Sequence, residues 1–267
     1  MLATASNDRT VRLWDVDSHQ CIATLNDHTH FVTSCKFSPH DTLAASASYD
    51  ETVRLWDVKS HRCIATLNGH MHYVNSCAFS SDGAVLASVG IDLAVRLWNT
   101  SAFINVATLQ GHKNSAYGCD ISRYGILAST SFDKTVRLWD MNEQYCMTVL
   151  NGHTGACIKC CFTADGTSLA STSNDKTVRL WDMRTRHNIA TLKDSDSGTD
   201  QCSFSSDGTW IAAACPFDNV ARVWDVKTLR CIATLHHCGY VCSCLFSSNG
   251  IIATAAGNKY QTVHLWQ

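Results

Sequence analysis

The sequence predicts an all-β fold made of seven repeated units, arranged as the blades of a propeller, and three observations predict it. Seven of the eight tryptophans stand at positions 14, 56, 98, 139, 181, 224 and 266, so successive gaps are 42, 42, 41, 42, 43 and 42 residues. The hexapeptide Thr-Val-Arg-Leu-Trp-Asp recurs at 10–15, 52–57, 135–140 and 177–182. Each period also holds several short β-prone runs separated by turn residues. A period of about 42 residues with four strands is typical of a propeller blade.

The period from residue 28 to residue 70 shows these runs most clearly. They cover 31–37, 43–48, 52–56 and 63–67, and no segment of the chain has helical periodicity over ten or more residues. Each four-stranded unit must have its two apolar faces covered by neighbours, which favours radial packing of blades. We therefore expect one domain over 1–267, with blades at about 1–27 (partial), 28–69, 70–111, 112–152, 153–194, 195–237 and 238–267 (partial).

The two ends of the chain predict incomplete first and last blades. Residues 2–6 align with the second strand of other blades, such as 86–88, and the chain stops just after Trp266. The inner strand of the first blade and the outer strand of the last blade are then missing. We expect 26 strands instead of 28 and an N-terminally shortened chain.

Composition argues against two classes of partner. The net charge is −2 and only 16% of residues are charged, so no basic field exists for nucleic acid or an acidic membrane. No apolar run approaches the roughly 20 residues that a membrane helix needs, and no export signal begins the chain. We expect an intracellular protein, cytoplasmic or nuclear or both, whose 15 cysteines are free thiols.

Short motifs at fixed phase make the repeat specific. A Gly-His pair opens three periods, at Gly69-His70, Gly111-His112 and Gly152-His153, and Trp-Asp closes the third predicted strand of most of them. The chain resembles the WD-repeat (β-transducin-like) family over its whole length. In that family a histidine, a second-strand serine or threonine, a turn aspartate and the tryptophan form a buried hydrogen-bonded tetrad.

The resemblance implies structural tetrads in three blades. Their members are His28, Ser48, Asp50 and Trp56; His112, Ser131, Asp133 and Trp139; and His153, Ser173, Asp175 and Trp181. Departures are expected where Gly90 and Pro216 replace the serine and where Ser195 and Cys238 replace the histidine. Since such residues satisfy each other between blades, they are interpreted as structure and not as catalytic machinery.

Nothing in the sequence predicts an enzyme, a cofactor or a metal centre. Two clusters have a spacing that superficially suits zinc: Cys157, Cys160 and Cys161, and then His236, His237, Cys238, Cys242 and Cys244. Neighbours along a strand point to opposite faces, so these side chains are interpreted mainly as packing.

The predicted function is a protein-interaction scaffold in a multiprotein complex. In WD-repeat proteins one face around the pore is formed by the loops entering the first strand and those joining the second and third. The resemblance places at this pore mouth Phe31, Thr33, Tyr49, Tyr73, Asn75, Ile91, Tyr117, Phe132, Ile158, Asp200, Phe217, Tyr240 and Cys242. Any one aromatic there can simply pad a neighbouring loop, but several on one face suggest a site for a partner peptide or loop.

An alternative function rests on residues 169–184. This segment resembles the Trp-Asp-x-Arg box by which some WD-repeat substrate receptors dock on a cullin-RING ubiquitin-ligase adaptor, with Arg184 as the key residue. Most of the match is the repeat itself, and Lys59 and Lys227 occupy the same position in other blades.

Overall fold

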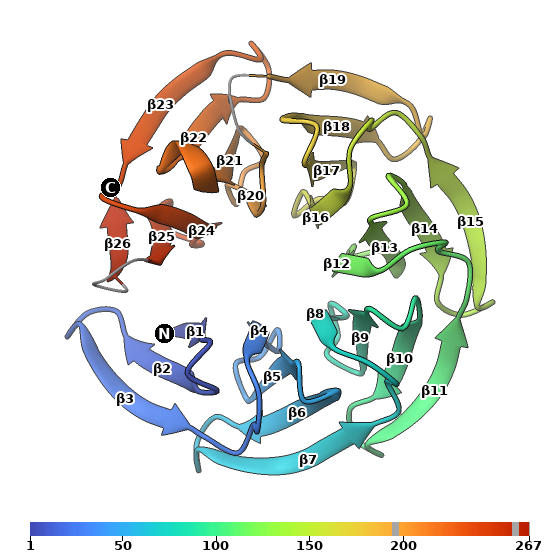
Figure 1. The fold of residues 1–267 in the computed structure, drawn as a ribbon, viewed down its shortest axis with the longest axis vertical. Helices are drawn as coiled ribbons and strands as arrows, with labels where there is room; N and C mark the ends of the chain where they lie inside the picture. The colour runs from blue at the N-terminus through green and yellow to red at the C-terminus, as the bar shows by residue number, and fades with distance from the viewer. Residues whose placement is uncertain (194–197, 258–261, 267) are drawn as a thin grey trace. The chain divides into compact units, whose positions relative to one another are not determined.

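The structure is a computed structural model that describes residues 1–193, 198–257 and 262–266. In this part of the chain there are 26 β-strands, one short 3-10 helix and no α-helix. The strands form seven antiparallel sheets, and the chain is an all-β seven-bladed propeller, as the sequence predicts (Figure 1). No helix among the described residues has the length and apolar character required to cross a membrane.

The chain divides into two compact units, whose boundary runs through the fourth blade. The N-terminal unit comprises 1–121, 125–129 and 139–147, and the C-terminal unit comprises 122–124, 130–138 and 148–267.

The first three blades belong to the N-terminal unit. Their strands are β1 (Leu2–Ala5), β2 (Val11–Asp15) and β3 (Gln20–Leu25); β4 (Val32–Phe37), β5 (Leu43–Ser48), β6 (Thr52–Asp57) and β7 (Arg62–Asn68); and β8 (Val74–Phe79), β9 (Val85–Gly90), β10 (Val95–Asn99) and β11 (Ile104–Leu109). The fourth blade consists of β12 (Ala116–Ile121), β13 (Ile126–Ser131), β14 (Val136–Asp140) and β15 (Tyr145–Leu150).

The last three blades belong to the C-terminal unit. Their elements are β16 (Cys157–Phe162), β17 (Ser168–Ser173), β18 (Val178–Asp182) and β19 (Asn188–Leu192); β20 (Cys202–Phe204), β21 (Trp210–Cys215), the 3-10 helix η1 (Pro216–Asp218), β22 (Val220–Asp225) and β23 (Cys231–His236); and β24 (Tyr240–Phe246), β25 (Ile252–Gly257) and β26 (Thr262–Trp266). Both the first and the last sheet have three strands, β1-β2-β3 and β24-β25-β26, as predicted.

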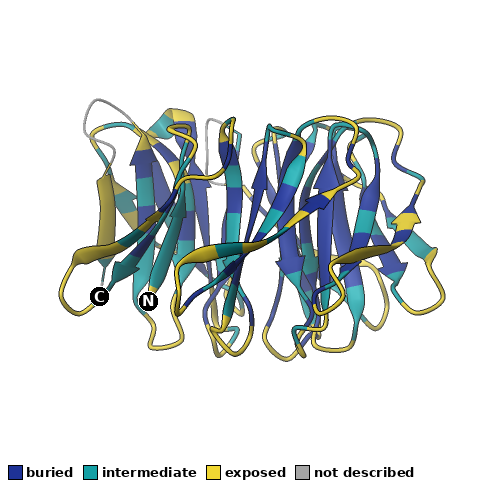
Figure 2. Cartoon of the chain, turned by 90° about the horizontal axis from the view of Figure 1, so that it is seen from below, coloured by how far each residue is buried: buried dark blue, intermediate teal, exposed yellow. Residues whose placement is uncertain are grey.

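The position of a strand within its blade decides its composition. Second strands such as β5 and β17 are buried over nearly their whole length, because neighbouring blades pack on both faces, and they consist mainly of alanine, serine and threonine. The outer strand β7 instead alternates between exposed and more buried residues, as a strand with one solvated face does. Figure 2 shows the same gradient, with dark blue strands inside and yellow segments outside.

Apolar side chains from consecutive blades share one core. Within the N-terminal unit, Val53 and Leu55 of β6 pack in a cluster with Leu86 and Trp98 of the next blade. In the C-terminal unit, Leu180 of β18 shares a cluster with Trp224 of β22. The repeated tryptophan therefore packs against the preceding blade, which explains why it recurs at the blade spacing.

Candidate functional site

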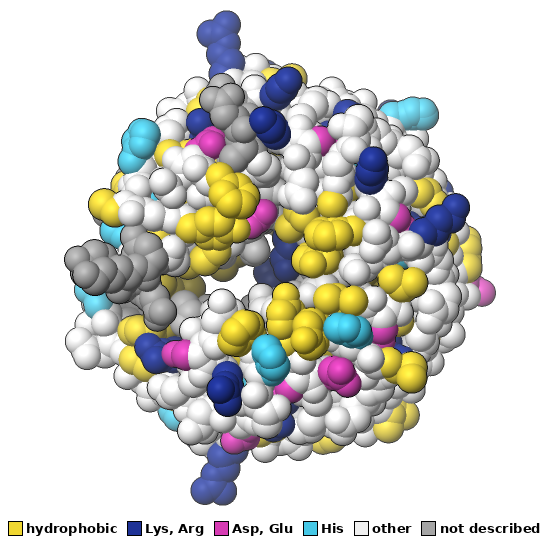
Figure 3. All heavy atoms as spheres, viewed as in Figure 1, with side chains coloured by type: hydrophobic (Ala, Val, Ile, Leu, Met, Phe, Trp, Pro, Cys, Tyr) yellow, Lys and Arg dark blue, Asp and Glu magenta, His cyan; other side chains and the backbone are white. Residues whose placement is uncertain are grey.

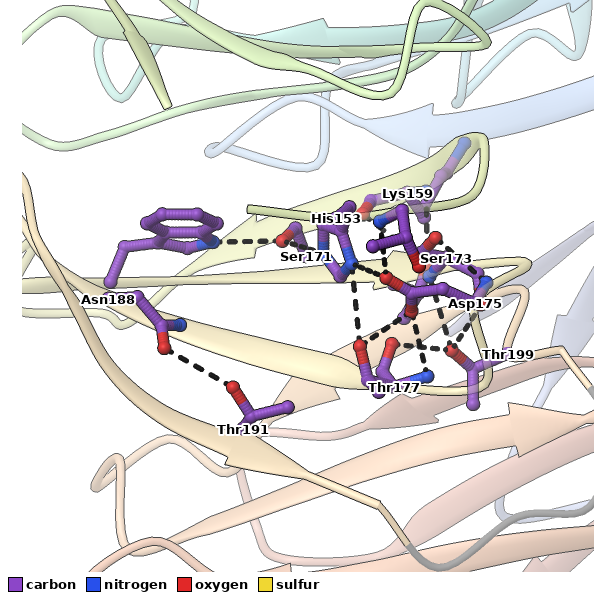
Figure 4. Close-up of polar contacts among 12 residues, drawn as sticks. His153, Lys159, Ser171, Ser173, Asp175, Thr177, Asn188, Thr191 and Thr199 are labelled. Atoms are coloured by element: carbon purple, nitrogen blue, oxygen red, sulfur yellow. Dashed lines mark hydrogen bonds and ion pairs between the residues drawn. The ribbon is translucent and has the colours of Figure 1, made fainter. Parts of the chain in front are cut away.

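The fifth blade contains a buried network of four side chains (Figure 4). His153 contacts Ser171 through Nε2 at 2.8 Å and Asp175 through Nδ1 at 2.8 Å. The indole Nε1 of Trp181 donates to the same Ser171 Oγ at 2.8 Å. Because a carboxylate only accepts hydrogen bonds, His153 Nδ1 carries the hydrogen in its contact with Asp175. The network connects the loop before β16 to three later strands or turns of the blade.

Three further blades have the same arrangement. The histidine Nε2 lies 2.7 Å from the serine Oγ, and the tryptophan Nε1 donates to that oxygen at 2.8 Å, in the sets His28, Ser46 and Trp56; His70, Ser88 and Trp98; and His112, Ser129 and Trp139. His28 contacts Asp50 at 2.7 Å, and His70 contacts Asp92 at 3.0 Å. The roles predicted for His28, Asp50 and His153, Asp175 are therefore confirmed.

The serines predicted for the tetrads are wrong. Ser48, Ser131 and Ser173 lie two residues further along the strand than the true members Ser46, Ser129 and Ser171. Residues two apart point to the same face but lie about 6.6 Å apart, which is beyond the reach of one indole N–H. Ser48, Ser131 and Ser173 instead cap the following turn, where each Oγ accepts the backbone N–H of the tetrad aspartate at 3.0 Å.

The two-residue change in the serine position also corrects the blades in which the tetrad serine was expected to be replaced. The third blade is complete, because Ser88 and not Gly90 occupies the serine position. Gly90 lies at the turn, where an added Cβ would be only 2.6 Å from the carbonyl oxygen of Tyr73. In the sixth blade Ala213, and not Pro216, stands opposite Arg222 at the serine position, so that blade lacks the hydroxyl.

The first and last blades replace the serine by threonine. Trp14 donates to Thr4 at 2.9 Å, and Trp266 donates to Thr254 at 2.8 Å. In the last blade His237, and not Cys238, packs beside the tryptophan, with ring centroids 5.5 Å apart. Ser195, the remaining expected departure, lies outside the described residues.

Each complete tetrad has the connectivity of a serine, histidine and aspartate catalytic triad, yet its position prevents such chemistry. Ser171 is fully buried and its oxygen already accepts the indole N–H, while His153 is 7% exposed. A nucleophile needs access to a substrate, and none of these hydroxyls has it. The tetrads stabilise the blades.

Electrostatics at the tetrads favours the ionised aspartate. Burial works to raise the pKa of Asp175, but hydrogen bonds from His153 and Thr177 outweigh it and hold the pKa far below its usual range. Asp50 behaves in the same way, with hydrogen bonds from His28 and Thr52.

Two sets of loops meet at one end of each sheet, and we call this end the loop face. The loop before a first strand bonds to the turn between the second and third strands, as Tyr49 N donates to Phe31 O at 2.9 Å and Ile91 N to Tyr73 O at 3.0 Å. On the N-terminal unit, Tyr49 and Tyr73 stack with centroids 4.2 Å apart, and Phe31 lies 6.1 Å from Tyr49. Figure 3 views this face and shows the apolar side chains gathered beside histidines.

Histidines that the sequence reasoning missed take part in this cluster. The His30 ring is 4.7 Å from Phe31 and 5.7 Å from Tyr49, and its Nδ1 accepts the Phe31 N–H at 2.8 Å. His72 accepts the Tyr73 N–H in the same way. Both stand two residues after a tetrad histidine, and this shared phase is the signal that could have found them.

A second apolar cluster lies on the loop face of the C-terminal unit. Phe217 and Tyr240 make an edge-to-face contact with centroids 5.4 Å apart, and Phe217 is 75% exposed. Tyr240 donates from its hydroxyl to Asp200 at 3.3 Å. Burial raises the pKa of Tyr240 to about 12, with the Asp200 carboxylate adding to the effect.

Two residues expected at the partner site instead link blades. Thr33 donates to the carbonyl of Val74 at 2.7 Å, and Asn75 donates to that of Ala116 at 2.8 Å. Asn75 is 6% exposed, and its side chain is occupied by this bond. Thr130 and Thr172 make equivalent bonds to the carbonyls of Ile158 and Asp200.

The other expected contact residues are partly covered. Ile91, Tyr117, Phe132 and Ile158 are each of intermediate exposure, and Cys242 is exposed. Burial raises the pKa of Tyr117, with Tyr49 contributing.

The three cysteines of the first cluster that suggested zinc, Cys157, Cys160 and Cys161, are arranged as packing residues. Cys157 and Cys160 are buried in β16, and burial raises the pKa of Cys157 far above its usual value. Cys161 lies 3.3 Å from Cys202 of the next blade, Sγ to Sγ. In the described part of the chain, no group of three or more histidine, cysteine or carboxylate side chains is arranged to hold a metal ion.

Arg184 lies in the turn between β18 and β19, at the end of the sheet opposite the loop face. It is exposed, as are Lys59 and Lys227 at the equivalent positions. Its only described electrostatic neighbour is Asp182, whose pKa is lowered mainly by hydrogen bonds from Thr185 and further by Arg184.

Comparison with known proteins gives one family and several partial relatives, including the two described below. The model of the WD domain, G-beta repeat, matches residues 1–15, 19–57, 61–99, 103–140, 144–182, 187–225 and 229–267. A stretch of 41 residues is 51% identical to the nuclear distribution protein PAC1 of Candida tropicalis, covering 15% of this chain and 8% of that protein. A stretch of 39 residues is 59% identical to the F-box-like/WD repeat-containing protein TBL1X of Mus musculus, covering 15% and 7%. The matches therefore span less than a tenth of either relative.

Proposed function

Because the chain belongs to the WD-repeat family, whose propellers are generally non-enzymatic scaffolds for protein complexes, we propose that it binds a partner peptide or loop on its loop face. The observation that carries this proposal is the exposure of large apolar side chains there. Phe217 is 75% exposed, and Phe31 and Tyr240 are each 38% exposed. Aromatic side chains of this kind are the residues that most often dominate binding energy at protein interfaces.

The loop face suits recognition because its aromatics sit on a rigid support. Tyr49 is held by its stack on Tyr73 and by its backbone bond to Phe31. A side chain already fixed in place loses little conformational entropy when a partner binds. Single exposed apolar residues are common on any surface, but a cluster is a stronger indication of binding.

The proposal is tested by identifying partners and then removing the exposed rings. Cross-linking mass spectrometry of the tagged chain in its native cells identifies direct partners and the segments that contact them. We expect cross-links near residues 31, 49 and 217. With the partner in hand, at least one of Phe31→Ala and Phe217→Ala should weaken affinity by more than about fivefold, since a truncated hot spot costs over about 1 kcal/mol.

Matched controls come from the outer strands. Ile22 and Ile189 are 42% and 56% exposed but lie away from the loop face, so Ile22→Ala and Ile189→Ala should leave affinity unchanged. None of the four variants removes a buried group, so melting temperatures should stay close to that of the parent chain. Undiminished affinity in both phenylalanine variants would move the binding site off the loop face.

A second candidate function uses the opposite end of the sheets. The exposed guanidinium of Arg184 supports docking on a cullin-RING ubiquitin-ligase adaptor, which would make the chain a substrate receptor. Arg184→Ala should then remove the adaptor from affinity-purified complexes but keep loop-face partners, and Lys227→Ala is the matched control. If the intact chain recovers no such adaptor, this candidate is rejected.

A further inference from the structure

Asp200 is the starting point, because it is partly buried on the loop face and forms no ion pair with a basic residue in the described part of the chain. Its backbone is fixed, since its N–H donates to Ala214 O at 3.0 Å and its carbonyl accepts from Thr172 Oγ1 at 2.6 Å. Its carboxylate accepts one hydrogen bond, from the Tyr240 hydroxyl at 3.3 Å. Burial raises the pKa of Asp200, and the bond from Tyr240 offsets only part of this effect.

Other aspartates near the loop face have basic partners. Asp218 pairs with Arg222 at 2.8 Å, Asp8 pairs with Arg12 at 2.9 Å, and Asp175 contacts His153. Among the described residues, no lysine, arginine or histidine forms an ion pair with Asp200. A carboxylate offers about four acceptor positions, and the described residues fill one of those on Asp200.

An aromatic corner stands beside this carboxylate. The planes of Phe217 and Tyr240 meet at 89°, with centroids 5.4 Å apart. The sixth period is one residue longer than most of the others. It contains the 3-10 helix η1, which begins at Pro216, carries Phe217 and ends at the C-cap residue Asn219 with φ 58°. Proline presets the φ that such a turn needs, so the exposed ring is held on a short, rigid support.

We propose that Asp200, Phe217 and Tyr240 form a site for an arginine side chain of the bound partner segment. The proposal rests on the proposed function and names the chemistry that this part of the loop face recognises. A guanidinium is planar and permanently charged, so it pairs with a carboxylate through two N–H groups while its plane lies on an aromatic ring.

The three side chains discriminate against other occupants. An apolar group placed here would cover the Asp200 carboxylate without pairing it, which is unfavourable. An anionic group would be repelled by the same charge. A lysine ammonium supplies charge but no plane to stack on Phe217, so arginine fits both features.

The test uses two peptides that differ only in charge. Acetyl-Ala-Arg-Ala-amide and its citrulline analogue, which is neutral and nearly isosteric, are titrated into the whole chain and followed by NMR. We expect the arginine peptide to bind at least about tenfold more tightly than the citrulline peptide. Asp200→Asn should abolish that preference, and Phe217→Ala should weaken binding of the arginine peptide.

The control variant is Asp17→Asn, which makes the same charge change at an exposed turn residue and should leave the preference intact. Three results each overturn the inference: equal affinity for the two peptides, an arginine preference that survives Asp200→Asn, or no saturable binding of either peptide. These comparisons do not depend on partner capture, so failure of the arginine site is distinguishable from failure of the proposed function. Because Phe217 is 75% exposed, Phe217→Ala is expected to fold even if Asp200→Asn does not.

Discussion

Replacing Ser171 by alanine isolates the contribution of one tetrad hydroxyl. The substitution removes a single oxygen from a fully buried site and leaves almost no cavity. It deprives both Trp181 Nε1 and His153 Nε2 of their 2.8 Å partner. Each buried polar group left without a partner costs about 1–3 kcal/mol, so with two such groups we expect Ser171→Ala to lower the free energy of unfolding by roughly 2–6 kcal/mol.

Ser173→Ala is the matched control, because it removes the same atom two residues along the same strand. Ser173 accepts one backbone N–H, from Asp175, so its loss should cost about 0.5–1.5 kcal/mol. Urea unfolding followed by tryptophan fluorescence measures both values. Ser171→Thr should retain much of the stability, since Thr4 and Thr254 accept the indole N–H of the equivalent tryptophans in the first and last blades. If Ser173→Ala destabilises the chain as much as Ser171→Ala, the assignment of the tetrad serine is refuted.

Two further predictions concern the same blade. Hydrogen bonds from His153 and Thr177 lower the pKa of Asp175, although burial works to raise it. The ionised Asp175 therefore stabilises the fold at pH values above its unfolded-state pKa of about 3.9. This stabilisation is lost as the pH falls toward the folded-state pKa. Unfolding free energy should therefore decline below about pH 4, and Asp175→Asn should flatten that decline in denaturation curves taken across pH. An added Cβ on Gly155 would lie 2.6 Å from the backbone nitrogen of Asp175, whereas one on Gly257 meets no atom of the described residues within 4 Å. Calorimetry should show a lower melting temperature for Gly155→Ala and little change for Gly257→Ala; equal effects would contradict this.

The repeat made the architecture predictable, because spacing and strand pattern survive in every blade. Tryptophan positions located all seven sheets, including the three-stranded first and last ones. Assignment of the tetrad serine failed for a physical reason: Ser46 and Ser48 both point to one face, and only three-dimensional distance selects the one that reaches Trp56. In the last blade His237, and not the neighbouring Cys238, packs beside Trp266.

The residues predicted for the partner site differ in their exposure. The aromatic residues Phe31 and Phe217 are exposed on the loop face, as a binding role requires. Thr33 and Asn75 occupy equivalent positions in the first strands of two successive blades. The side chain of each donates to a carbonyl of the next blade. Sequence spacing does not tell whether such a side chain faces solvent or bonds to the next blade, because this depends on how closely the neighbouring blade approaches.

The side-chain bonds between blades bear on how such a chain diversifies. In each case the donor is a particular side chain, Thr33, Asn75, Thr130 or Thr172, whereas the acceptor is a main-chain carbonyl of the following blade. Every residue type has that carbonyl, so the recipient needs no matching substitution. A duplicated or exchanged repeat therefore keeps this bond to the blade after it as long as it carries its own donor.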